Sequence, residues 1–116
     1  MKFTAILVIA PDDLEEKVIE HAQRAGAAGV TILQGKGIGG EARKTFFGLT
    51  FEGMQSVLLM VVGTHLSAPI LKELHQILVR GTESRGLAFA VPIEHLTGID
   101  MRQVVKFEEL LRQDDA

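Results

Sequence analysis

The sequence contains no cysteine, no tryptophan and no tyrosine, and each absence removes a class of function. Without cysteine the chain cannot form a disulfide, a thiolate nucleophile or a zinc–thiolate site. Nucleic-acid binding is disfavoured too, because two aromatic residue types are missing and the basic residues are scattered rather than gathered on one face. We therefore expect a small-molecule or protein partner and no nucleic acid.

Long hydrophobic runs are absent as well. The longest, AILVIA and VLLMVV, are far shorter than the roughly 20 residues that cross a bilayer. Residues 1–10 carry only Lys2 as a charge and lack a cleavage-type ending, unlike a secretory leader. The expectation is a cytoplasmic protein with no direct membrane insertion.

No catalytic or metal-binding motif stands out among the polar residues. Ser67 and Ser84 lack the context of a nucleophile elbow, and the acidic pairs fit helix caps or solvated faces. The four histidines lack H-x-H and H-x-x-x-H spacing and are expected at the surface: His21, His65, His75 and His95. We predict that the protein is not an enzyme and assign no metal ligand.

What is present indicates one compact domain. The chain has 116 residues, 47% of them apolar, and a net charge of -3, which suits a single core over residues 1–116. Apolar runs predict strands at residues 3–9, 30–34, 54–62 and 87–91. Apolar residues at helical spacing predict one helix ending before Gly26 and another with Pro69 in its first turn and Gly81 just past its end.

Helix caps are predicted from acidic residues. Asp12 or Asp13, followed three residues later by Glu15 or Glu16, matches a capping box for the first helix. Asp100 with Gln103 gives the same pattern and predicts a C-terminal helix at about residues 101–112.

The order β-α-β-β-α-β predicts an α+β, ferredoxin-like fold, with four antiparallel strands and both helices on one face. One face of the sheet then has no cover. Because VLLMVV is apolar at six successive positions, we expect burial on both faces and hence a partner subunit.

The segment GKGIGG fits the dinucleotide-binding fingerprint G-x-G-x-x-G through Gly35, Gly37 and Gly40. In that motif a helix begins at the third glycine, but here EARKTFFGLTFEG follows and has no stable apolar stripe. A dinucleotide-binding turn is therefore disfavoured. The glycines either make a simple turn or leave backbone N–H groups free to meet an anion or a base edge.

Two longer segments, GVTILQGKGIG and RGLAFAVPIEHLTGI, carry a resemblance. Over roughly residues 1–99 the chain resembles the PII signal-transduction superfamily. The resemblance implies a homotrimer with adenine nucleotides in the clefts between subunits. A T-loop at about residues 37–54 and a B-loop at about residues 81–87 would line each cleft.

Residue by residue, the resemblance implies nucleotide contacts, most of them through backbone groups. The matching positions are Thr31, Lys36, Gly37, Ile38, Gly39, Val61, Val62, Ser84, Arg85, Gly86 and Leu87.

Three cationic phosphate contacts of the family are missing. Leu87 replaces the B-loop lysine, and Thr97 and Ile99 replace two arginines. Other arginines could reach phosphate from different anchor points, namely Arg80, Arg85 and Arg102. We therefore expect AMP or ADP to bind more readily than ATP.

The T-loop segment KTFFGLTFEGM resembles the short T-loops of PII-like proteins that accompany membrane transporters. Lys44, Phe46, Phe47 and Phe51 are the residues expected to contact a membrane transporter or another protein target. Alternatively, the rings pack against the sheet of their own subunit. Modification of a tyrosine is excluded because the chain has none.

The leading hypothesis is a trimeric regulatory protein whose T-loop changes shape when a small molecule binds. One alternative is a trimeric metal-binding protein resembling the divalent-cation-tolerance family, which shares the fold. Another is a purely structural trimer.

Overall fold

The computed structural model describes residues 1–37, 45–46, 49–50 and 53–100, together with positions 102, 106 and 109. Its six main elements are β1 (Phe3–Pro11), α1 (Glu15–Arg24), β2 (Thr31–Gly37), β5 (Gly53–Gly63), α2 (Ser67–Leu78) and β8 (Leu87–Ile93). The predicted order β-α-β-β-α-β is confirmed.

Shorter elements lie between these six. Single turns of 3-10 helix precede the two helices: η1 (Asp12–Leu14) and η2 (Thr64–Leu66). Four two-residue strands form two small hairpins: β3 (Thr45–Phe46) with β4 (Leu49–Thr50), and β6 (Val79–Arg80) with β7 (Glu83–Ser84).

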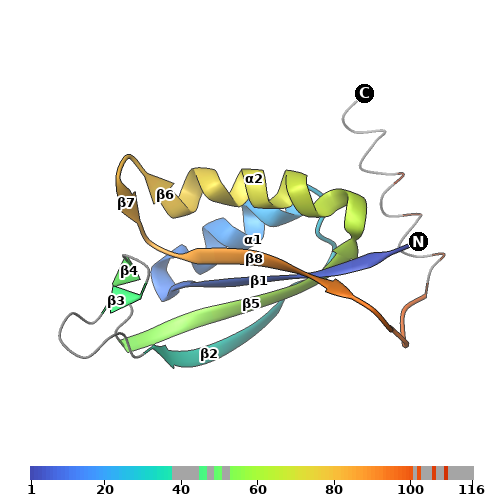
Figure 1. The fold of residues 1–116 in the computed structure, drawn as a ribbon, viewed down its shortest axis with the longest axis horizontal. Helices are drawn as coiled ribbons and strands as arrows, with labels where there is room; N and C mark the ends of the chain where they lie inside the picture. The colour runs from blue at the N-terminus through green and yellow to red at the C-terminus, as the bar shows by residue number, and fades with distance from the viewer. Residues whose placement is uncertain are drawn as a thin grey trace.

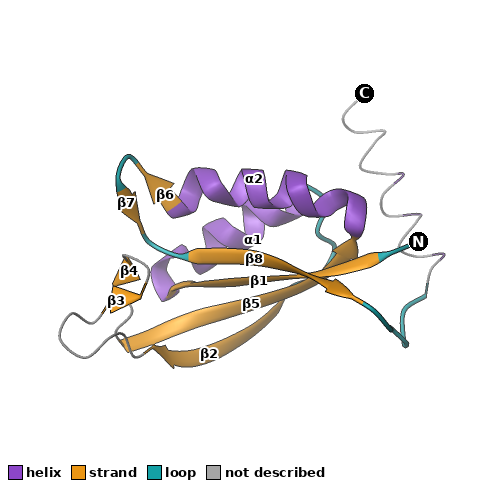
Figure 2. Ribbon diagram, in the orientation of Figure 1, coloured by secondary structure: helices purple, strands orange, loops and turns teal. Residues whose placement is uncertain are grey.

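The main sheet has the strand order β2-β5-β1-β8, and each strand is antiparallel to its neighbour. Figures 1 and 2 show α1 and α2 on one side of this sheet. The α+β, ferredoxin-like prediction is therefore correct. The predicted excursion is confirmed for the described residues, because β2 and β5 pair up to Gly37 opposite Gly53, and β3 and β4 between them form a separate two-stranded sheet.

Alternation along β1 positions the core. Ile6, Val8 and Ala10 are fully buried beneath the helices, whereas the residues between them are partly exposed on the other face. The helices meet this surface with apolar residues four positions apart. Val18 and Ala22 of α1, and Ile70, Leu74 and Leu78 of α2, are buried.

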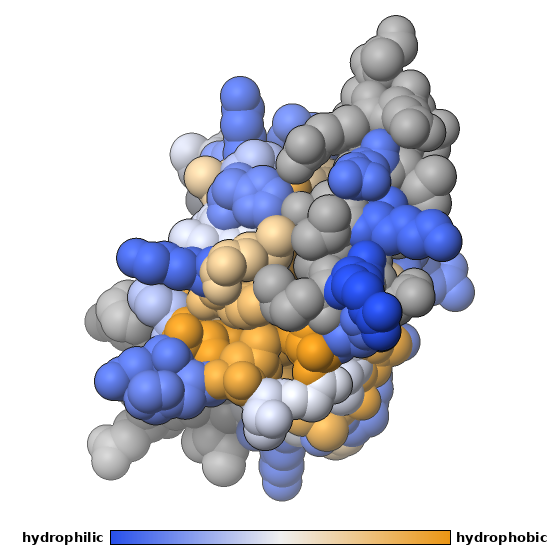
Figure 3. Space-filling model, turned by 90° about the vertical axis from the view of Figure 1, so that its right-hand side faces the viewer, coloured by the Kyte–Doolittle hydropathy of each residue, from blue (hydrophilic) through white to orange (hydrophobic). Residues whose placement is uncertain are grey.

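The opposite face of the sheet is apolar but uncovered in the described part of a single chain. Its exposed side chains include Leu33 (54%), Val61 (40%), Phe89 (37%) and Val91 (43%). These exposures confirm the expected uncovered face. Figure 3 looks at another part of the surface, the end of the molecule that carries the N-terminus, where apolar residues also gather between polar ones.

The predicted capping box of the first helix is wrong. The N-cap of α1 is Leu14, and no side chain caps it, because the 3-10 turn at residues 12–14 shifts the helix start to Glu15. The Asp12 and Asp13 side chains instead contact residues outside the helix. The predicted glycine stop is confirmed, since Gly26 follows α1 with a φ of 122°.

Gly81 does not end the second helix directly. The chain becomes extended at Val79, immediately after α2, and Gly81 has a φ of 60° in the turn between β6 and β7. Pro69 lies in the first turn of α2, as predicted.

The predicted C-terminal helix is supported at its first residues. Asp100 Oδ1 accepts a hydrogen bond from the Arg102 N–H at 3.0 Å, as a cap would. Positions 102, 106 and 109 are helical, and the rest of the predicted helix at residues 101–112 lies outside the described residues.

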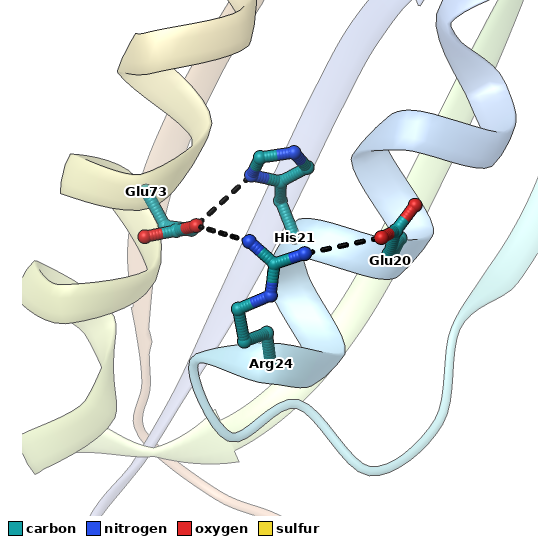
Figure 4. A network of polar contacts seen from close by, with 4 residues as sticks. All are labelled: Glu20, His21, Arg24 and Glu73. Carbon is teal, nitrogen blue, oxygen red and sulfur yellow. Dashed lines mark hydrogen bonds and ion pairs between the residues drawn. The ribbon is translucent and has the colours of Figure 1, made fainter.

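A polar network joins the outer surfaces of the two helices (Figure 4). His21 Nδ1 lies 2.9 Å from Glu73 Oε1, and Arg24 reaches both Glu73, at 3.5 Å, and Glu20, at 3.0 Å. The His21 side chain is 20% exposed, so the expected surface role of this histidine takes the form of a contact between α1 and α2.

Candidate functional site

Three predicted ligand-binding positions lie along the edge strand β2. Thr31, opposite Leu59, and Lys36, opposite Met54, are exposed, whereas Gly37 at the end of the strand is buried. Because the two residues are five positions apart in the strand, their side chains point to opposite faces of the sheet. Ile38 and Gly39 lie outside the described residues.

The two predicted positions on β5 point to opposite faces. Val61 is 40% exposed on the uncovered face, opposite Ala5, whereas Val62 is 4% exposed and belongs to the core. The Val62 side chain is therefore not available to a ligand. Any contact at this position has to use its backbone.

The B-loop contains a hairpin with two different faces. Val79 pairs with Ser84, and Arg80 pairs with Glu83, so successive residues point to opposite sides. The Arg85 N–H extends the hairpin by donating to the Leu78 carbonyl oxygen at 2.8 Å.

One face of the hairpin borders a cavity of about 330 Å³ between α2 and the start of β8. Three predicted positions line it: Ser84, Gly86 and Leu87. Leu71 and His75 of α2 are further lining residues, which the sequence did not single out. The Ser84 hydroxyl donates to the Gly86 carbonyl oxygen at 3.2 Å and so holds the loop above the cavity.

Packing alone disfavours any residue larger than glycine at position 86. A Cβ there would lie 2.6 Å from Leu78 Cδ2, 3.0 Å from the Ile9 carbonyl oxygen and 3.1 Å from Ala10 Cβ. This glycine lets the loop lie directly on the core before β8 begins. Its presence therefore has a structural reason besides any contact with a ligand.

The predicted contact residue Arg85 already has a partner within the chain. One terminal nitrogen of its guanidinium lies 3.0 Å from Asp13 Oδ1 and 2.8 Å from Asp13 Oδ2. This hydrogen bond holds the pKa of the Asp13 carboxyl below its ordinary value. Asp13 and Arg85 thus join the start of α1 to the B-loop.

The cations proposed as replacements lie apart from the cavity beside Leu87. Arg80 and Arg85 border the other face of the hairpin. Arg102 is 93% exposed, with Nε 3.6 Å from Asp100 Oδ1. Thr97 and Ile99 line a cavity of about 390 Å³ beyond the far end of β8, together with Lys2.

A buried hydroxyl ties the start of β5 to the start of α1. Ser56 is fully buried, and its Oγ lies 2.8 Å from Asp12 Oδ1 and 2.6 Å from Glu15 Oε2. A hydroxyl has one proton and can donate to only one of these oxygens at a time. The contact fixes the strand to which the predicted T-loop returns.

The positions predicted on the two edge strands do not converge within one chain. Strands β2 and β8 are separated by β5 and β1, so they lie about 14 Å apart at about 4.8 Å per strand. A ligand packed along the free edge of β2 therefore cannot occupy the cavity beside β8 of the same chain.

Of the predicted partner-binding residues, three lie outside the described residues: Lys44, Phe47 and Phe51. The backbone of Phe46, in β3, pairs with Leu49 of β4.

The described ranges hold no group of three or more histidine, aspartate or glutamate side chains arranged to bind a metal. His75 lines the cavity beside α2, and His95 is 91% exposed with Nε2 3.6 Å from Glu94 Oε1. Neither α1 nor α2 is long and apolar enough to span a membrane, and no other described helix is.

Sequence comparison matches most of the chain to one family. The profile of the family described as "Nitrogen regulatory protein P-II" matches residues 3–103. No curated protein sequence matches the chain.

Several solved structures share the fold. CPII of Thiomonas intermedia, bound to ADP, AMP and acetate, is 18% identical with a TM-score of 0.60, covering 79% of this chain and 86% of that one. Bacillus subtilis GlnK in complex with ATP is 16% identical with a TM-score of 0.62, covering 79% and 82%. The periplasmic divalent cation tolerance protein CutA of Archaeoglobus fulgidus is 16% identical with a TM-score of 0.66, covering 94% and 98%.

Proposed function

Because this chain belongs to the nitrogen regulatory protein P-II family, we propose that it is a regulatory protein that binds an adenine nucleotide between subunits. One observation carries the proposal most directly. The predicted ligand-binding positions occupy opposite edges of the sheet, so a ligand that uses both sets requires two copies of the chain.

A homotrimer would bring these edges together. In a closed ring, β2 of one subunit faces the B-loop of the next, and each contact repeats around the symmetry axis. The uncovered apolar face supports this assembly, since Leu33, Val61 and Val91 would leave water when the three sheets pack inward.

The proposed ligand is AMP or ADP, with ATP weaker. Leu87 beside the cavity cannot neutralise a phosphate, and Thr97 and Ile99 are uncharged as well. Each missing charge-assisted hydrogen bond costs about 1.5 to 3 kcal/mol, and the loss matters most for the ligand with the most phosphates. CPII, which shares the fold, was solved with ADP and AMP.

We propose that ligand binding changes the conformation of the T-loop. A nucleotide beside Gly37 would favour one conformation of the segment that follows, and a protein partner would bind that conformation. We propose a membrane transporter as that partner and the cytoplasm as the location. Lys44, Phe46, Phe47 and Phe51 would make the contact.

Calorimetry tests the ligand. The full chain is titrated with AMP, ADP and ATP, each with and without magnesium, and its mass is measured by sedimentation. We expect a trimer that binds one nucleotide per chain, with AMP or ADP ahead of ATP. A trimer that binds none of the three would refute the nucleotide proposal.

Mixing two variants tests the position of the site. Gly37→Val disables the β2 side, and Leu87→Glu repels phosphate from the B-loop side. Each trimer alone should fail to bind. After dissociation and reassociation at equal amounts, about a quarter of the sites combine two intact halves, so binding should return to that extent. No recovery from a mixed trimer would place the site within one chain.

Leu87→Lys tests the expected preference for AMP or ADP over ATP by restoring a positive charge. A lysine at the edge of the cavity would meet a phosphate and should favour ATP over AMP by tenfold or more. Leu87→Met is the matched control, since it keeps the size and lacks the charge. An unchanged preference in the lysine variant would show that phosphate does not lie beside this position.

A metal-binding trimer is the second candidate, because the CutA fold matches over nearly the whole chain. Calorimetry with divalent ions alone separates the two candidates. Heat with a metal and none with nucleotides would favour the metal-binding function.

A further inference from the structure

The second face of the B-loop hairpin borders its own cavity, of about 360 Å³. The lining residues are Leu14, Lys17, Ile77, Arg80, Glu83 and Arg85. They come from η1, α1, the end of α2 and the hairpin with the residue that follows it. This cavity and the one beside Leu87 share no lining residue, because the hairpin lies between them.

Three cations meet at this cavity, and within the described residues two of them, Lys17 and Arg80, form no ion pair or side-chain hydrogen bond. Arg85 is held by Asp13 through a single terminal nitrogen, which orients its guanidinium. Among the lining residues Glu83 is the one carboxylate, and it stands opposite Arg80 in the hairpin register.

The charged side chains at this cavity carry a net charge of one positive unit in the absence of a ligand. The three cations exceed the two carboxylates, Glu83 and Asp13, by one. The cations also approach from three elements: Lys17 from α1, Arg80 from β6 and Arg85 from the residue after β7. Such an arrangement suits a tetrahedral oxyanion with several outer oxygens better than a planar carboxylate, which a single guanidinium fork satisfies.

We propose that this cavity binds a small phosphate-bearing ligand, at a site separate from the nucleotide cleft. Lys17 and Arg80 supply two positive charges, and Arg85 supplies an oriented guanidinium. Leu14 and Ile77 give the cavity an apolar wall for the remainder of the ligand. Since Asp13 begins the connection to α1, occupation would strengthen the link between the B-loop and that helix.

Titration of the full chain with inorganic phosphate at low ionic strength tests the site. We expect saturable binding at one phosphate per chain, reduced tenfold or more in Lys17→Ala and in Arg80→Ala. Lys72→Ala is the matched control, because it removes one exposed positive charge from α2 outside the cavity. It should bind as the unmodified chain does. Equal losses in all three variants would overturn the proposal by showing a general effect of net charge.

Glu83→Gln tests the proposal through an expected increase in the affinity for phosphate. Removing the carboxylate that faces the ligand should strengthen phosphate binding severalfold. Weaker binding in this variant would contradict the proposed geometry. So would the absence of saturation by about 10 mM phosphate in the unmodified chain, or tighter binding of malonate than of phosphate.

Parallel titrations with AMP separate this site from the proposed nucleotide cleft. Lys17→Ala should bind AMP as the unmodified chain does, because Lys17 is not among the predicted nucleotide contacts. If it loses AMP and phosphate together, the cavity belongs to the nucleotide site and the claim of a separate site fails. If the unmodified chain binds phosphate and no nucleotide, the nucleotide function fails while this site stands.

Discussion

The two faces of the main sheet are almost equally apolar, yet only one is covered within the described part of the chain. On the helix side, Ile6, Val8 and Leu58 are fully buried. On the other side, Leu33 and Val91 are 54% and 43% exposed. The difference lies in position and not in residue type, because adjacent residues of one strand supply both faces.

This contrast distinguishes folding from assembly. The helix-covered face gives the chain its own core, whereas the open face retains an apolar surface that a second copy could bury. We therefore expect the chain to keep its fold when its state of association changes. The following predictions test whether the two faces are separable in this way.

Val91→Asp should have the largest effect. A trimer would bury three carboxylates at its centre, and each buried charge costs several kcal/mol. We expect sedimentation to show monomers while the far-ultraviolet circular dichroism keeps its helical signal. Gln76→Asp, on the exposed surface of α2, is the control and should leave the mass unchanged. A trimer that survives Val91→Asp would show that this face is not the interface.

Leu58→Ala should destabilise the core on the helix-covered face and hence the fold itself. Truncation of this fully buried side chain should lower the free energy of unfolding by about 2 to 5 kcal/mol. Leu33→Ala is the matched control and should cost under about 1 kcal/mol in the monomeric Val91→Asp background. Denaturant unfolding of both variants in that background gives the comparison. Similar costs for the two would mean that the faces are not distinct.

Gly86→Ala should have an intermediate effect at the edge of the covered face. The added methyl would lie 2.6 Å from Leu78 Cδ2, so we expect a loss of about 1 to 3 kcal/mol in thermal or denaturant unfolding. Gly29→Ala should cost nothing, because no atom lies within 4 Å of its added Cβ. An unaffected Gly86→Ala variant would show that the loop moves away from the core easily.

Arg85→Ala should have the smallest effect, since its ion pair lies outside both faces. The pKa of the Asp13 carboxyl should rise toward its ordinary value, which carbon NMR titration can measure. Because the folded pKa is lowered, the ion pair stabilises the fold above the ordinary pKa of aspartate. That contribution is lost as the pH falls through the lowered value. Arg24→Ala is the control and should leave the Asp13 titration unchanged.

Several features could be predicted from the sequence because they depend on local chemistry. The apolar run at residues 3–9 predicts a strand, and the helical spacing from Ile70 to Leu78 predicts a helix; patterns of these two kinds gave the correct element order. Gly26 was predicted correctly as a stop because a left-handed residue at a helix end favours glycine. The resemblance at GVTILQGKGIG and RGLAFAVPIEHLTGI indicated the family that the profile match shows.

Other features depended on contacts between distant residues. The capping box failed because Asp12 and Asp13 contact Ser56 and Arg85, which are 44 and 72 positions away in the chain. The two-faced hairpin was also missed, although Val79 and Arg80 alternate with Glu83 and Ser84 in a pattern that could have indicated it.

The sequence by itself determined the order of elements, the apolar character of both sheet faces and the absence of thiol chemistry, because residue type and spacing fix each of these. Only the tertiary structure decided which face the helices cover and that the predicted ligand-binding positions lie on opposite edges. It also brought Lys17, Arg80 and Arg85 to one cavity. Strand order and the crossing of the helices set these relations, and they follow from packing between segments that are distant in the chain.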